Sequence, residues 1–114
     1  MAKQLLLDRN FCSELVSVAR VAGDGRTESV IGNLEEIGER SALVLTDSPI
    51  AAENRVDITC GSNVLKGVVK SCTRDRALGY FIEIELTRGS DWSPQWFSPQ
   101  HLICFSELRL RFSA

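Results

Sequence analysis

The sequence predicts an all-β fold, a six-stranded antiparallel β-barrel with short C-terminal helical turns. Three observations indicate this fold. Short runs rich in β-branched residues recur at regular intervals along the chain. Residues with turn chemistry separate the runs, as at 23–25 and 61–63. No amphipathic helical pattern lies between the runs, which favours a barrel over an α/β sheet.

Six of these runs are expected to be strands. In chain order they are 15–21, 28–34, 41–46, 55–60, 64–72 and 80–86. The alternation is clearest in the fourth run, where Val56, Ile58 and Cys60 would face the core. The last two runs would form a hairpin that brings Lys70 near Glu83 on the solvent face, and opposite charges across a strand pair help to fix register.

The composition changes after Leu86. Ser93 and Pro94 are typical of the first residues of a helix, and Trp92 could pack on Phe97 across that helix start. The same arrangement recurs from 98 to 102, so two short helical turns are expected. The tail 105–112 alternates apolar and basic residues, a pattern that fits a final strand or a short helix.

The length of 114 residues and the net charge of −2 indicate one domain with no basic footprint for nucleic acid or anionic lipid. We divide the chain into an N-terminal lead segment (1–10), a barrel (11–102) and a C-terminal extension (103–114). The extension would pack on the barrel or on a partner, which could be a second copy. No apolar run approaches membrane-spanning length, and the N-terminus lacks the features of a signal peptide, so a cytoplasmic protein is expected.

The residues that usually carry catalysis or metal binding are not arranged for either task. The four cysteines form no close pair, and the single histidine, His101, completes no metal-ligand spacing. Cys60 and Cys72 could be neighbours on adjacent strands, as reduced thiols. Glu83 and Glu85 fit a solvated strand face. We therefore expect no enzyme, no metal site and no cofactor.

The order of these features resembles the PilZ domain family. The segment 33–38, Asn-Leu-Glu-Glu-Ile-Gly, is similar to that family's Asp/Asn-x-Ser-x-x-Gly motif. The segment 40–46, followed by Pro49 and the strand around Val56, looks like the family's middle strands. The run 66–69 and the run 79–86 resemble its closing hairpin.

The resemblance implies a small barrel that binds cyclic di-GMP in bacterial signalling, with Asn33, Gly38 and Arg9 as candidate ligand-binding residues. Two departures weaken that expectation. Ser13 stands where the family's Arg-x-x-x-Arg motif would place a second arginine after Arg9, and Glu35 stands where the family has serine. At an effective dielectric of about 20, a carboxylate in contact with the ligand's phosphate costs on the order of 4 kcal/mol, or roughly a thousandfold in affinity.

The function expected from these residues is a non-catalytic signalling or adaptor module that contacts another protein and binds cyclic di-GMP weakly or not at all. The alternative is a true cyclic di-GMP receptor that recruits Arg9 with Arg20 or Arg26. Asn33 and Gly38 also fit a simple polar turn, with Gly38 supplying a positive φ. Trp92 and Trp96 could anchor a partner or close the barrel.

Overall fold

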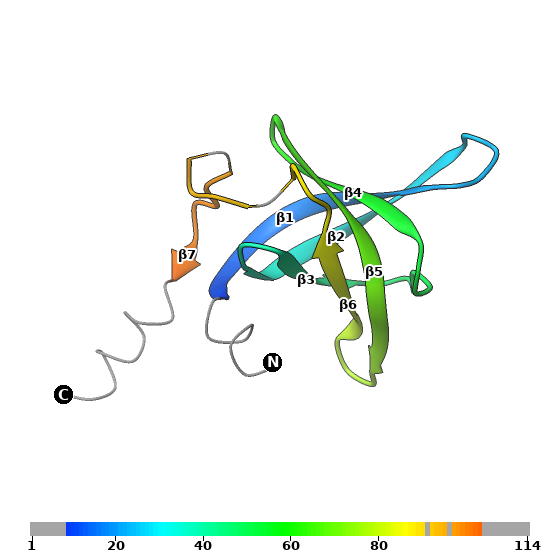
Figure 1. Cartoon of the computed structure of the whole chain (residues 1–114). Coiled ribbons are helices and arrows are strands. Elements are labelled where there is room, and N and C mark those ends of the chain that lie inside the picture. The colour runs from blue at the N-terminus through cyan, green and yellow to red at the C-terminus, as the bar shows by residue number, and fades with distance from the viewer. Residues whose placement is uncertain (1–8, 91, 96, 104–114) are drawn as a thin grey trace.

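The computed structural model describes residues 9–90, 92–95 and 97–103, and in these residues it contains strands and turns but no helix (Figure 1). Seven strands are present in this part of the chain. They are β1 (Asn10–Val21), β2 (Thr27–Ile37), β3 (Ser41–Thr46), β4 (Arg55–Cys60), β5 (Asn63–Asp75), β6 (Gly79–Leu86) and β7 (Leu102–Ile103).

The first six strands close into an antiparallel barrel, which confirms the predicted fold class. Their order in the sheet is β2-β3-β6-β5-β4-β1, and β1 pairs with β2 again to close the ring. Closure is possible because β1 uses both of its edges. Val18 lies opposite Val30 of β2 on one side and opposite Ile58 of β4 on the other. The short β7 adds to the other end of β1, with Phe11 opposite Ile103.

The core fills the inside of the barrel and follows the alternation of the sequence. In β4, Val56 and Ile58 are buried while Arg55 is exposed, as predicted. The same holds in the β5–β6 hairpin, where one face of each strand is buried. The buried apolar residues are Val16, Val18, Leu34, Ile37, Ala42, Val44, Ile50, Val56, Ile58, Leu65, Val69, Ile82, Ile84, Leu86, Trp92 and Phe97.

Three strands, β1, β2 and β5, are several residues longer than the sequence pattern predicted, and β2 continues past 34 to Ile37. β1 begins at Asn10 rather than at 15, because an irregularity between Phe11 and Glu14 interrupts the alternation but not the pairing with β2. β5 continues through its charged end to Asp75. The Asp75 carboxylate accepts hydrogen bonds from the backbone N–H groups of Ala77 and Leu78, both at 2.9 Å, and so shapes the turn to β6.

The segment after β6 packs against the end of the barrel. The Ser93 hydroxyl accepts a hydrogen bond from the Gln95 N–H at 3.3 Å, and the Ser93 carbonyl accepts one from the Phe97 N–H at 2.9 Å. Ser93 therefore caps a single turn. The second helical turn, expected at 98–102, is not formed, because Leu102 begins β7. Trp92 donates its indole N–H to the Phe97 carbonyl, and both side chains are buried, so they close this end of the barrel. Trp96 and the tail 105–112 lie outside the described residues.

The expectation that Cys60 and Cys72 are neighbours is wrong. Cys60 lies opposite Asn63 at the β4–β5 turn, whereas Cys72 lies opposite Ile82. β5 extends past the end of β4, whose pairing stops where Arg55 faces Val68, so Cys72 has no residue of β4 beside it. Cys12, Cys60 and Cys72 are all free thiols. In the part of the chain that the structure describes, no helix has the length and apolar character needed to cross a membrane.

The close approach of β5 and β6 depends on Gly67. A Cβ atom at this position would lie 2.6 Å from the Glu85 carbonyl oxygen and 2.6 Å from Ile84 Cγ2. We expect Gly67→Ala to lower the free energy of unfolding by about 1–3 kcal/mol in urea denaturation, because a backbone neighbour cannot easily yield.

Gly23→Ala is the matched control. A Cβ atom at Gly23 would meet nothing within 4 Å, so a change within about 0.5 kcal/mol is expected. Equal stability of the two variants would contradict the tight strand contact.

Candidate ligand-binding site

The residues of the PilZ-like motif lie along the second half of β2 and the corner that follows it. Against β3, the pairing shifts register between Leu34 and Glu36, so that Glu35 occupies a bulge. A bulge adds one residue to a strand and re-aims the side chains around it. Glu36 and Leu43 then lie opposite each other, while Ile37 and Ala42 return to the core.

Asn33 uses both the nitrogen and the oxygen of its side-chain amide within the protein. Its Nδ2 donates to the Glu35 carboxylate, and its Oδ1 accepts from the Ser13 hydroxyl at 3.3 Å. It lies inside β2, opposite Leu15 of β1 and Leu45 of β3, and is not a turn residue. The residue that replaces the family's serine thus engages the residue that would contact a ligand.

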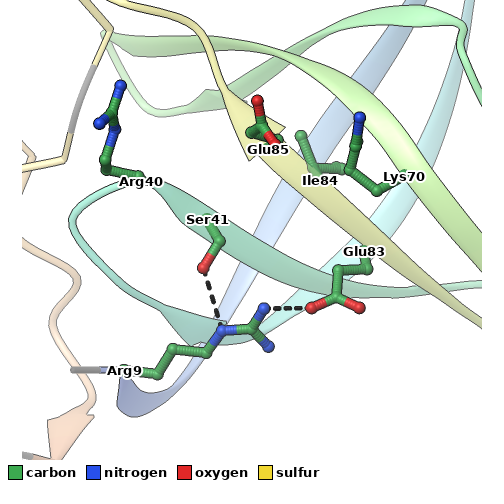
Figure 2. Close-up of a pocket in the computed structure, with 7 residues that line it drawn as sticks. All are labelled: Arg9, Arg40, Ser41, Lys70, Glu83, Ile84 and Glu85. Atoms are coloured by element: carbon green, nitrogen blue, oxygen red, sulfur yellow. Dashed lines mark hydrogen bonds and ion pairs between the residues drawn. The ribbon is translucent and has the colours of Figure 1, made fainter. Parts of the chain in front are cut away.

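Arg9 is the most enclosed charged group described, with 8% of its side chain exposed. Its Nε donates to the Ser41 hydroxyl at 3.0 Å, and one terminal nitrogen pairs with Glu83 (Figure 2). The other terminal nitrogen lies 3.9 Å from the Glu36 carboxylate. A single guanidinium therefore joins the lead segment to β2, β3 and β6. The sequence suggested Lys70 as the neighbour of Glu83, but it is Arg9 that makes the ion pair.

A pocket of about 430 Å³ opens beside this ion pair (Figure 2). Its lining is charged except for Ser41 and Ile84, and comprises Arg9, Arg40, Ser41, Lys70, Glu83, Ile84 and Glu85. The side chains of Arg40 and Lys70 make no hydrogen bond or ion pair with any described residue. Lys70 lies at a register shift of β5, between Val69 and Ser71.

Gly38 belongs to the Arg9 side of the site. It is buried, and its N–H donates to the Ser41 carbonyl at 2.8 Å. Its φ is not positive, so the expectation of a left-handed turn at Gly38 is wrong. Of the three predicted residues, the structure links Arg9 and Gly38 through Ser41 and places Asn33 in a separate cluster with Glu35 and Ser13.

Cys12 of β1 lies near this site, and the sequence did not connect it with the site. Burial raises the pKa of the Cys12 thiol to about 12, with further contributions from Glu14, Glu35 and Glu36. Its Sγ donates to the Leu34 carbonyl at 3.5 Å. Burial and Glu14 also raise the pKa of Cys60. The nearby carboxylates therefore disfavour the thiolate form of both cysteines.

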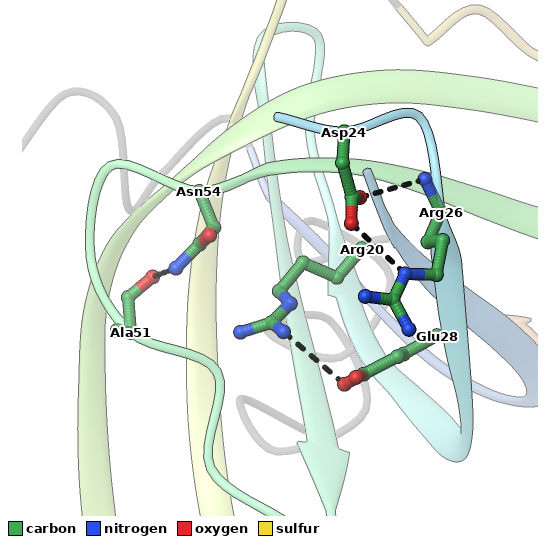
Figure 3. Close-up of polar contacts among 6 residues, drawn as sticks. All are labelled: Arg20, Asp24, Arg26, Glu28, Ala51 and Asn54. Atoms are coloured by element: carbon green, nitrogen blue, oxygen red, sulfur yellow. Dashed lines mark hydrogen bonds and ion pairs between the residues drawn. The ribbon is translucent and has the colours of Figure 1, made fainter. Parts of the chain in front are cut away.

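The other two candidate arginines lie at the opposite end of β1. Arg20 pairs with Glu28 at 3.2 Å, and Arg26 pairs with Asp24 at 2.9 Å (Figure 3). Hydrogen bonds from the Arg26 backbone and side chain lower the pKa of Asp24. From Asn10 to Arg20 an extended strand spans about 33 Å, so neither arginine can share a small ligand with Arg9.

His101 stabilises the packing of the C-terminal segment on β1. Its N–H donates to the Glu14 carboxylate at 2.9 Å, and its ring Nδ1 lies 3.2 Å from the same oxygen. The ring is largely exposed. The described residues contain no group of three or more His, Cys, Asp or Glu side chains that could hold a metal ion.

The Arg9 ion pair should contribute measurably to stability. We expect Arg9→Met to lower the free energy of unfolding by about 1–2 kcal/mol, a value reduced by the partial exposure of Glu83. Arg88→Met, at an exposed arginine without a described partner, should change it by less than about 0.5 kcal/mol. Equal effects of the two variants in urea denaturation would show that the ion pair is unimportant.

The Cys12 thiol should be poorly reactive in the folded protein. With a pKa of about 12 instead of 9.0, its thiolate fraction near neutral pH falls about a thousandfold. In a Cys104→Ser background, iodoacetamide labelling of Cys12 should be at least about a hundredfold slower in the folded than in the urea-unfolded chain. The folded rate should rise about tenfold per pH unit up to roughly pH 10, because the thiolate is still the minor form. Equal folded and unfolded rates, measured by mass spectrometry, would contradict this environment.

A scan against protein-family models, a search of the curated proteins and a search of the solved structures each return no match to this chain. The resemblance to the PilZ family therefore stays a prediction that depends on the motif residues and on the order of the strands.

Proposed function

We propose that this chain is a non-catalytic, PilZ-like signalling or adaptor module that works in the bacterial cytoplasm by contacting another protein. Its affinity for cyclic di-GMP would be weak or absent. The six-stranded antiparallel barrel and the position of the 33–38 segment at the β2–β3 corner support the proposal. A module of this kind needs a stable scaffold with a specific outer surface, and no catalytic group.

One observation carries the proposal: the polar groups of the family's ligand motif are already satisfied by carboxylates of the chain itself. Glu35 holds the Asn33 amide, while Glu83 and Glu36 hold the Arg9 guanidinium. A dianionic ligand would have to displace these carboxylates from Asn33 and Arg9. It would then still lie close to their negative charges. Each like-charge contact costs on the order of 4 kcal/mol at an effective dielectric of about 20.

The alternative function, a cyclic di-GMP receptor, has one observation in its favour. The pocket beside Arg9 also presents Arg40 and Lys70, neither of which has a partner among the described residues. Arginine forks and lysine ammonium groups both bind phosphate. The same pocket contains Glu83 and Glu85, which oppose an anion. Arg20 and Arg26, the arginines suggested by the sequence, are too distant to contribute.

Isothermal titration of the full chain with cyclic di-GMP, at low and at physiological salt, tests the proposal. We expect no heat of binding at micromolar ligand. Ser13→Arg combined with Glu35→Ser should then bring detectable binding, because the pair restores the arginine and the hydroxyl of the family motif.

The matched control is Glu28→Ser with Ser29→Arg, which makes the same change of composition on the exposed end of β2. This variant should give no heat of binding with cyclic di-GMP. Micromolar or tighter binding by the unmodified chain would overturn the proposal in favour of the receptor. If neither double variant gives heat of binding, the barrel has no dinucleotide site that these substitutions can restore. That result would argue against the PilZ-like interpretation.

A further inference from the structure

The outer surface of the barrel carries an uncharged face where β4, β1 and β2 lie side by side. One row across these strands and the adjoining β5 runs Val64, Thr59, Ser17 and Ile31, each opposite the next. Leu15 projects from β1 two residues before Ser17, which makes it a diagonal neighbour of Ile31. We call these five residues the β1 face. Because Val16 and Val18 point into the core, Leu15 and Ser17 must point outward.

The apolar side chains of the β1 face are unusually accessible. Leu15 is 73% exposed, Ile31 61% and Val64 49%. They come from three different strands. The smaller side chains of Ser17 and Thr59 lie between Val64 and Ile31 in the row. Single exposed apolar residues are ordinary on protein surfaces, whereas a group of large ones around small neighbours is typical of an interaction surface.

The border of this face on the β2 side is acidic. Next to Leu15 lies Asn33, whose amide partner is the Glu35 carboxylate, and no ion pair joins Glu35 to a cation within the described part of the chain. Glu36 shares the single Arg9 guanidinium with Glu83.

The border on the β5 side has balanced charge. Lys66 follows Val64 by two residues and lies opposite Asp57 of β4. A second copy that docked through its own β1 face would therefore bring no net positive surface to the acidic border. The charge distribution instead favours a different protein that carries positive charge next to aliphatic side chains.

We propose that the β1 face is the docking surface for a basic amphipathic segment of a partner protein. Aliphatic side chains of that segment would cover Leu15, Ile31 and Val64, while its lysines or arginines would reach Glu35 and Glu36. This inference rests on the proposed adaptor function and specifies the chemistry of its partner. Complementary charge would speed association and fix the orientation of the segment, and burial of the apolar side chains would supply affinity.

The test uses the full chain and a fluorescein-labelled amphipathic leucine–lysine peptide as the probe, with anisotropy as the readout. We expect saturable binding that weakens as salt is raised. Leu15→Ser and Ile31→Ser should each raise the Kd about tenfold, since both remove large exposed anchors. Glu35→Gln should raise it about threefold and flatten the salt dependence. A leucine–glutamate peptide of the same pattern should not bind.

Two control variants match these changes elsewhere on the barrel. Leu78→Ser removes an apolar side chain that is 57% exposed at the β5–β6 turn, and Glu53→Gln removes an exposed carboxylate from the segment between β3 and β4. Both should leave the Kd unchanged. No binding of the basic peptide, equal binding of the acidic peptide, or equal losses in the control variants would overturn the proposed docking surface.

Two further results separate this inference from the adaptor function itself. If the chain sediments as a dimer that Leu15→Ser converts to a monomer, the β1 face is a self-contact and the inference is wrong. If the peptide fails to bind while cyclic di-GMP also gives no heat, the docking surface is overturned but the adaptor proposal stands. Tight cyclic di-GMP binding overturns the adaptor proposal whatever the peptide does.

Discussion

The whole structure depends on the double pairing of β1. Between Ser17 and Arg20 this strand bonds β2 along one edge and β4 along the other, which turns an open sheet into a closed ring. Closure gives every barrel strand one inward and one outward face, and leaves no free edge at this part of β1. The core then fills the inside, and all recognition must take place on the outside or at the barrel ends.

Much of the barrel could be predicted from alternation alone. In β4 and in the β5–β6 hairpin, each inward residue is apolar or glycine, and a period of two leaves only one register that buries them. The bulges could not be predicted in this way. At Glu35 of β2 and at Lys70 of β5, an additional residue shifts the pairing, and no local pattern of side chains specifies where a strand will accept one.

The sequence singled out residues for the candidate site, but it could not specify which other residues they contact. The resemblance to the PilZ motif singles out Asn33, Gly38 and Arg9, with Glu35 as the residue that departs from that motif. The Arg9 partners are Ser41 and Glu83, which lie 32 and 74 residues further along the chain. Which cation pairs with an acidic residue at such separations is decided by the tertiary fold. Lys70 lines the same pocket as Glu83, as the hairpin register predicted, but the ion pair of Glu83 is with Arg9.

The bond from Arg9 to Glu83 also bears on how the molecule is made. Arg9 leaves the ribosome early and Glu83 late, so their ion pair can form only after most of the chain has been synthesised. In the same way, β3 can pair with β6, its neighbour in the ring, only after β6 has been synthesised. Until then Val44 and Ala42, which are fully buried at the end, have only β2 beside them. Pairings between distant segments form slowly because long loops must close first. During translation the nascent chain therefore exposes apolar residues of an incomplete barrel. Binding by a chaperone would be most useful in that period.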